Sequence, residues 1–116
     1  MLSPLFDSHL HIIDPRHPLV PNRGFIPPPF SVDDYVQRVK GLNVIGGAVV
    51  AGSFHGFDTG HLVAALRKLG PNFVGVAQVP GDISDSEILR LDARGIRAVR
   101  FNLARCGSVT PEALDS

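Results

Sequence analysis

Apolar and polar residues follow one another along this chain in short blocks, and their rhythm changes near residue 30. Four mostly apolar runs are too short or too rich in glycine for stable helices, so they predict strands over 5–10, 44–51, 72–79 and 96–101. The segments between them carry apolar residues at helical spacing, which predicts amphipathic helices. The chain is therefore predicted to alternate strands and helices.

The predicted helices start at residues whose side chains accept a hydrogen bond from a free backbone N–H, and most of them stop at a glycine. At two starts an acidic residue follows three positions later, which completes a capping box. The starts are Ser31 with Asp34, Asp58, Ser84 with Glu87, and Thr110, and the stops are Gly41, Gly70 and Gly95.

Strands that alternate with helices indicate a parallel sheet with right-handed crossovers. The later strands are predicted to start at residues 44, 72 and 96, and a (β/α)8 barrel averages about 31 residues per unit. We therefore expect an α/β fold of the (β/α)8 TIM-barrel type, of which this chain supplies about the first four units. Residues 1–116 would be the N-terminal half of a single barrel domain; a complete small doubly wound domain is the alternative.

Composition narrows the class of protein. The 116 residues are 44% hydrophobic and 19% charged, which is typical of a globular domain and excludes a disordered chain. Eleven basic residues balance eleven acidic ones, and the absence of a Lys/Arg cluster argues against a nucleic-acid or membrane-surface partner. The N-terminus shows no secretory signal, and no stretch is apolar enough to span a bilayer. The single cysteine, Cys106, favours a reducing, cytoplasmic compartment.

The first predicted strand ends in His9-Leu10-His11, and residues two apart on a strand point to the same face. Both imidazoles can therefore face the barrel axis at the mouth formed by the C-terminal strand ends, where such barrels keep their active sites. Two inward imidazoles can supply half of a divalent-metal site, for which Zn²⁺ is the usual candidate; a purely structural pair of histidines is the alternative. A long loop over 14–30, which holds most of the prolines, follows this strand; long ordered loops are often functional.

The second and fourth predicted strands also end in polar residues. Ser53 and His55 are two apart, so both can reach the mouth and contact a ligand; a turn that satisfies backbone donors is the alternative. Arg100 and Asn102 share one face at the end of the fourth strand. An arginine there supplies a planar fork for a carboxylate, unless it forms a salt bridge within the barrel floor. Arg105, in the loop beyond, is either a second anion contact or solvated.

Three further residues have simpler interpretations. Asp58 is explained by helix capping alone. His61 lies in the first turn of the same helix and is expected to be exposed. His17 belongs to the proline-rich loop, where it can line the entrance to the site.

Three segments resemble one known family. The sequence DSHLH at 7–11, followed by a proline-rich loop, is similar to the start of the amidohydrolase superfamily. GIRAVRFN at 95–102 resembles the fourth-strand signature of its amidohydrolase-2 branch, and SFHGFD at 53–58 resembles the 2-pyrone-4,6-dicarboxylate hydrolases and related lactonases. The resemblance implies a (β/α)8 barrel and an enzyme that opens a lactone, or cleaves a related carboxylate compound, by water attack.

Positions that match the family's motifs take on roles by that resemblance. His9 and His11 match the first two metal ligands of the superfamily and would act in catalysis. The usual catalytic aspartate follows the eighth strand, beyond Ser116. The lactonase branch works without a tightly held metal, so the resemblance implies either no cofactor or a divalent metal such as Zn²⁺. The positions expected to bind a small carboxylated substrate are Ser53, His55, Arg100, Asn102 and Arg105.

Three interpretations stay open at this point. The first is a lactonase acting on a carboxylated ring ester, with the aspartate as general base and cationic and imidazole groups stabilising the oxyanion. The second is a metal-dependent amidohydrolase or decarboxylase of the same superfamily. The third is non-enzymatic, an inactive truncated half-barrel that folds only with a partner. Half a barrel leaves strand edges unpaired, so it can also associate into a homo-oligomer.

Overall fold

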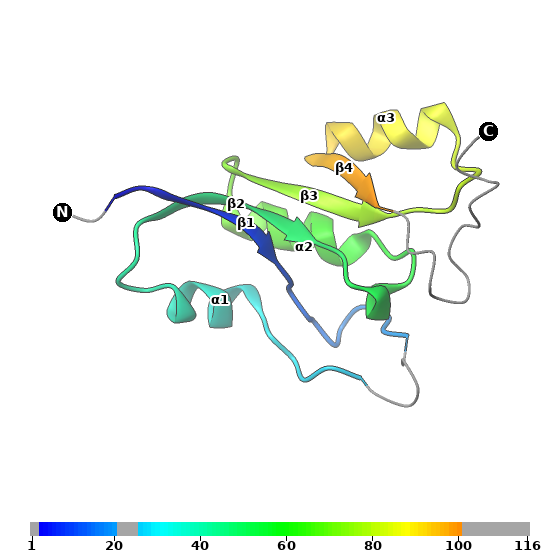
Figure 1. Cartoon of the computed structure of the whole chain (residues 1–116). Coiled ribbons are helices and arrows are strands. Elements are labelled where there is room, and N and C mark those ends of the chain that lie inside the picture. The colour runs from blue at the N-terminus through cyan, green and yellow to red at the C-terminus, as the bar shows by residue number, and fades with distance from the viewer. Residues whose placement is uncertain (1–2, 21–25, 101–116) are drawn as a thin grey trace.

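The computed structural model describes residues 3–20 and 26–100. Within them, four strands form one parallel sheet in the order β1-β2-β3-β4. Figure 1 shows their arrows running the same way, so the C-terminal strand ends lie on one side of the molecule. The predicted parallel α/β sheet is confirmed. Its strands are β1 (Leu5–Leu10), β2 (Val44–Val50), β3 (Phe73–Gln78) and β4 (Ile96–Arg100).

Among the residues that the structure describes, three α-helices and one short 3₁₀ turn lie between the strands. They are α1 (Val32–Arg38), η1 (Ser53–His55), α2 (Gly60–Leu69) and α3 (Asp85–Ala93). In Figure 1, α2 lies behind the middle of the sheet and α3 lies beside β4. The order of elements from β1 to β4 is the order that the hydrophobic pattern predicts, and the predicted helix start at residue 110 lies outside the described residues.

Two of the predicted capping boxes differ in completeness. Ser31 Oγ accepts a hydrogen bond from the N–H of Asp34, whose carboxylate accepts one from the N–H of Ser31, so the box of α1 is complete. Ser84 Oγ accepts from the N–H of Glu87 at the start of α3. The Glu87 carboxylate pairs with Arg90 instead, so this box keeps one of its two bonds.

One buried cluster joins the helices to the sheet. Val49 and Ile96 from the strands meet Leu62 and Leu66 from α2, and burying each such side chain contributes about 1.5–3 kcal/mol relative to exposing it. The other face of the sheet is open in places, and Phe6 of β1 is 58% exposed there. In the described ranges, no helix combines the length and the apolar character that crossing a bilayer requires.

A shift of register in β1 determines which face its histidines occupy. Asp7 and Leu10, three residues apart, pair with residues only two apart on β2, so both lie on the helix-covered face. There the Asp7 carboxylate accepts a hydrogen bond from the Tyr35 hydroxyl of α1 at 2.9 Å; burial, together with this bond, raises the pKa of Tyr35. Asp7 also accepts the backbone N–H of His9. The shift leaves the side chains of His9 and His11 for the open face.

Candidate active site

His9 and His11 converge at the end of β1. Their Nε2 atoms are 3.3 Å apart, and the two rings meet edge to face. His11 Nδ1 lies 2.7 Å from the carbonyl oxygen of Val50, the last residue of β2. Because a carbonyl oxygen only accepts, Nδ1 carries the proton of the neutral ring. His11 Nε2 therefore presents a lone pair to the Nε2–H group of the His9 ring. The two imidazoles lie on one face, as their spacing predicts.

The same geometry fits two ligands of a metal ion. Two nitrogens bound about 2.0–2.1 Å from a tetrahedral zinc ion lie about 3.3 Å apart, which is the Nε2 to Nε2 distance of His9 and His11. The bond from His11 Nδ1 to Val50 resembles the outer hydrogen bond that usually orients a ligating imidazole. In the part of the chain that the structure describes, no third His, Cys, Asp or Glu joins the two. A metal would therefore need ligands from elsewhere.

Arg100 ends β4 and reaches across β3 to the end of β2. Its Nη1 donates a hydrogen bond to the carbonyl oxygen of Ala51 at 3.0 Å. No carboxylate among residues 3–20 and 26–100 lies within ion-pair distance of this guanidinium, so the alternative of a salt bridge has no partner there. A partly buried cation whose other N–H donors have no partner among the described residues favours an anionic ligand.

Two successive carbonyl groups at the end of β2 hold the two halves of this site. Val50 accepts from His11, and Ala51 accepts from Arg100. The imidazole pair and the guanidinium are therefore fixed to neighbouring peptide units, one from the β1 side and one from the β4 side. Sequence reasoning missed Val50 and Ala51. Every residue has a carbonyl group, and an apolar side chain does not indicate that the carbonyl group of its residue accepts a hydrogen bond from the site.

His55 lies in η1 and is 1% exposed. Its Nδ1 accepts a hydrogen bond from the N–H of Gly52 at 2.9 Å, and its Nε2 donates to the carbonyl oxygen of Ile12 at 3.1 Å. Burial, and the neighbouring ring of His61, lower the pKa of His55 to about 3, so the ring is neutral at pH 7. Both nitrogens are occupied by backbone groups, which leaves neither of them free for the substrate contact that the sequence predicts.

His61 is buried, so the prediction that it is exposed is wrong. It is 1% exposed, and its ring stacks on that of His55 with the centroids 3.6 Å apart. Asp58 Oδ2 accepts hydrogen bonds from both the backbone N–H and Nδ1 of His61; Asp58 thus satisfies the first turn of α2, although Thr59 holds the cap position. Burial lowers the pKa of His61. The apolar Ala65, one turn further along α2, is the sequence signal that could have indicated this buried face.

Three other residues are predicted to contact the substrate. Asn102 and Arg105 lie outside the described residues, and Ser53 is the first residue of η1.

Sequence reasoning also missed Gln78 at the end of β3, which is buried and is the register partner of Arg100. Its Nε2 donates to the carbonyl oxygen of residue 56 at 3.1 Å, which ties the end of β3 to the loop after η1.

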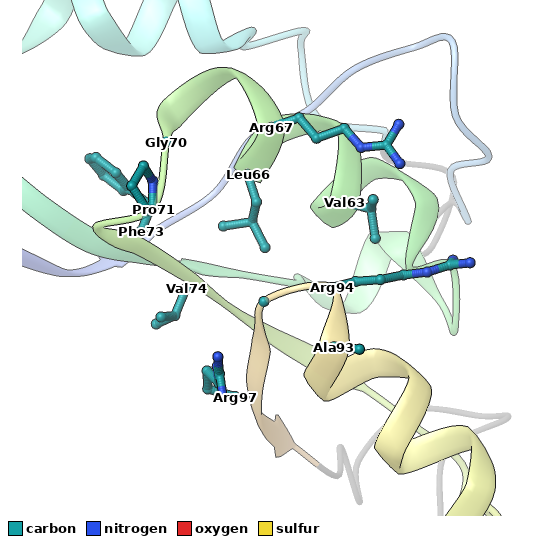
Figure 2. Close-up of a pocket in the computed structure, with 11 residues that line it drawn as sticks. Val63, Leu66, Arg67, Gly70, Pro71, Phe73, Val74, Ala93, Arg94 and Arg97 are labelled. Atoms are coloured by element: carbon teal, nitrogen blue, oxygen red, sulfur yellow. The ribbon is translucent and has the colours of Figure 1, made fainter.

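A cavity of about 570 Å³ opens at the other end of the sheet, near the starts of β3 and β4. Figure 2 shows Val63 and Leu66 of α2 pointing toward this space, whereas Arg67 and Arg94 extend along its side. Within the described residues, its lining holds no histidine, carboxylate or nucleophilic side chain. The groups able to do chemistry therefore gather at the C-terminal strand ends and not in this cavity.

Solved structures establish the fold to which the four strands belong. A probable 2-pyrone-4,6-dicarboxylic acid hydrolase from Acinetobacter baumannii, with citric acid bound, has a TM-score of 0.77 and 22% identity; the match covers 95% of this chain and 43% of that chain. A protein from Agrobacterium tumefaciens, solved in its apo form, has a TM-score of 0.80 and 22% identity, with 95% and 41% covered. The described strands and helices are thus consecutive units of a (β/α)8 barrel.

Two curated relatives and one family model match this chain. The 2-pyrone-4,6-dicarboxylate hydrolase of Comamonas testosteroni is 33% identical over 101 residues, which cover 85% of this chain and 33% of that protein. The 4-sulfomuconolactone hydrolase of Rhizobium radiobacter is 28% identical over 98 residues, with 83% and 33% covered. This chain therefore spans about a third of the length of the curated relatives it matches. A family model described as amidohydrolase matches residues 6–115, and the chain belongs to the amidohydrolase family.

Proposed function

We propose that this chain supplies part of the active site of a hydrolase that opens a carboxylated lactone by water attack. The observation that carries the proposal is the guanidinium of Arg100, which has no carboxylate partner among the described residues and is joined to His9 and His11 through successive peptide groups of β2. An anchored cation beside two imidazoles suits a substrate that has both a carboxylate and a reactive carbonyl.

The names of two relatives support this class of substrate. The Comamonas testosteroni protein is named for a pyrone dicarboxylate, and the Rhizobium radiobacter protein is named for a sulfonated lactone. Both compounds are ring esters that carry acidic groups. We therefore expect the protein that contains this chain to act on a lactone with at least one carboxylate.

In this proposal, Arg100 binds the substrate carboxylate. The bond from Nη1 to Ala51 orients the plane of the guanidinium and leaves further N–H groups for a paired contact with both carboxylate oxygens. A hydrogen bond to a charged group contributes about 1.5–3 kcal/mol. Asn102, Arg105 and Ser53 stay predicted as additional contacts to the substrate.

The imidazoles act on the carbonyl group that water attacks. His9 is exposed, and its Nε2–H, which His11 accepts in this structure, can turn to the carbonyl oxygen of the lactone as that oxygen gains negative charge. His11 remains fixed by its bond to Val50. The general base that removes a proton from water is expected to be an aspartate outside this sequence.

A second candidate is a metal-dependent amidohydrolase or decarboxylase. The 3.3 Å between the Nε2 atoms and the bond from His11 Nδ1 to Val50 favour it. His9 and His11 would each hold the ion through Nε2. When bound, a divalent ion supplies a Lewis acid and lowers the pKa of a water molecule.

The test is an assay of the complete protein that carries this sequence, with 2-pyrone-4,6-dicarboxylate and with its neutral dimethyl ester. The lactonase proposal predicts ring opening, a strong preference for the dicarboxylate, and activity that survives a chelator. Loss of activity on chelation, restored by Zn²⁺, would favour the metal-dependent candidate. The absence of ring opening for every carboxylated lactone tried would reject the lactonase.

A further inference from the structure

His55 joins the two strand ends that carry the proposed catalytic and binding groups. It accepts the N–H of Gly52, the residue after Ala51, at 2.9 Å. It donates to the carbonyl oxygen of Ile12, the residue after His11, at 3.1 Å. One ring, which we call the His55 bridge, therefore connects the peptide unit that follows Ile12 to the peptide unit between Ala51 and Gly52, whose carbonyl group accepts from the guanidinium.

The two bonds of the His55 bridge require a single tautomer. The N–H of Gly52 faces Nδ1, so this nitrogen must carry the lone pair, and the carbonyl oxygen of Ile12 faces Nε2, which must carry the proton. Neither nitrogen has a bond left for a ligand while both partners are in place. Any effect of His55 on the reaction must then pass through the two backbone segments that it joins.

The groups around His55 keep the ring in this position. His61 stacks on it at a centroid distance of 3.6 Å and an angle of 16° between the planes, and Phe54 lies against it at 4.5 Å. His61 is itself held by the Asp58 carboxylate through two hydrogen bonds. The ring therefore has little freedom to leave the strand ends.

We infer that His55 is a positioning residue that fixes His9 and His11 relative to Arg100, and that it does not itself bind substrate. This inference rests on the proposed function. A displacement of about 1 Å between reacting groups can cost about 100-fold in rate. Arg100 keeps its own bond to Ala51 without the bridge, so loss of the bridge should reduce kcat and leave binding of the carboxylate largely intact.

Three substitutions in the complete protein separate the bridge from simple packing. His55→Asn keeps an acceptor near Nδ1 for Gly52, His55→Gln keeps a donor near Nε2 for Ile12, and His55→Leu fills the space with neither bond. We expect kcat to fall about 10-fold in the Asn and Gln variants and about 100-fold in the Leu variant. The KM for a carboxylated lactone should change by less than about threefold.

Ser84→Ala is the matched control, because it removes a helix-capping bond of α3 and touches none of these groups. It should lower Tm and leave kcat unchanged. A packing role for His55 predicts the reverse order, with leucine tolerated best and kcat intact in every folded variant, and would overturn the inference. So would a rise in KM at unchanged kcat, which would assign His55 to substrate binding, or a failure of all three variants to fold.

The ring of His11 gives a second readout that needs no substrate. In ¹⁵N-labelled protein, its signals report the Nδ1–H tautomer that the bond to Val50 requires. We expect these signals to change in all three His55 variants and to stay the same in Ser84→Ala. Changed signals in a protein that opens no lactone would reject the proposed function and leave the positioning role standing. Unchanged signals and unchanged kcat in an active lactonase would reject the positioning role alone.

Discussion

The chain contains two pairs of touching histidines that differ in nearly every physical respect. The open pair, His9 and His11, lies at the end of β1 with the Nε2 atoms turned toward each other at 3.3 Å. The buried pair, His55 and His61, stacks face to face with the centroids 3.6 Å apart, and each ring is 1% exposed. Both pairs lie near the same strand ends, so position in the barrel does not distinguish them.

The difference shows that the environment decides what an imidazole can do. In the open pair, one bond from His11 Nδ1 to the backbone fixes the geometry, and the two Nε2 atoms contact each other. In the buried pair, both nitrogens of His55 and Nδ1 of His61 bond to protein groups. Burial also keeps both rings neutral at pH 7. The open pair should therefore govern activity, and the buried pair should govern stability and alignment.

The largest expected effect is on the stability provided by the buried pair. His61→Ala removes a fully buried ring and leaves a cavity, so it should lower the free energy of unfolding by about 2–5 kcal/mol. His9→Ala, at an exposed position, should change it by less than about 0.5 kcal/mol. Urea unfolding followed by circular dichroism measures both variants. Equal losses of stability in the two variants would contradict the assignment of stability to the buried pair.

The next largest effect should come from Arg100, the cation anchored beside the open pair. Arg100→Ala removes a charge-assisted contact of about 1.5–3 kcal/mol, which corresponds to a loss in kcat/KM of about 10- to 150-fold on a carboxylated lactone. Arg100→Lys keeps the charge but loses the planar fork, so it should not restore activity. Kinetics on the acid and on its neutral ester measure the effect. An equal loss on both substrates, with a lower Tm, would show that Arg100 only braces the barrel.

Acid should destabilise the fold through the buried pair. The pKa of His55 is about 3 in the folded protein, below the value of about 6.5 for an unfolded histidine. The unfolded chain binds the proton first, so the stabilising contribution is complete above about pH 6.5 and is lost as the pH falls toward 3. His55 alone should cost about 2 kcal/mol at pH 5 relative to neutral pH, and the lowered pKa of His61 acts in the same direction.

Denaturant midpoints measured between pH 7.5 and pH 5 check this dependence. His55→Leu should lose a large part of it, whereas His9→Ala should keep it. A flat profile in the unsubstituted protein would show that the two rings remain neutral, or are equally shifted, in the unfolded chain.

The smallest expected effect is that of metal removal on the open pair. The lone pair of His11 Nε2 already has a partner in the N–H of His9, and no third ligand joins them in the described ranges. For a lactonase, chelation should change kcat/KM by less than about twofold. Elemental analysis alongside the assay is the measurement, and a stoichiometric metal that follows activity would assign the open pair to metal binding.

Much of the fold could be predicted because element boundaries leave local signals in the sequence. Ser31 and Asp34 form the predicted box at α1. Gly70 and Gly95 adopt φ angles of 98° and 94°, a region that favours glycine, at the predicted helix ends. These features depend on a few neighbouring residues, so they can be inferred without knowing the tertiary structure.

The site could be predicted only in part, because its decisive contacts join distant segments. The spacing of His9 and His11 indicated a shared face, but the register shift that places Asp7 on the other face involves β2 and leaves no signal in β1 alone. The burial of His61 depends on how α2 meets η1. Both nitrogens of His55 form hydrogen bonds with backbone groups elsewhere in the chain, the N–H of Gly52 and the carbonyl oxygen of Ile12, and the sequence around His55 does not predict these bonds.

The anchoring of the site to the carbonyl groups of Val50 and Ala51 has a consequence for how such a protein can evolve. The carbonyl oxygen remains when a side chain is replaced. These two positions can therefore accept different small apolar residues that fit the buried surroundings, and the distance between the histidines and Arg100 stays the same. Insertion of one residue between them would separate the two halves by a strand step of about 3.3 Å. Selection at this junction should therefore act on chain length and backbone path, and an alignment scored on residue identity would overlook it.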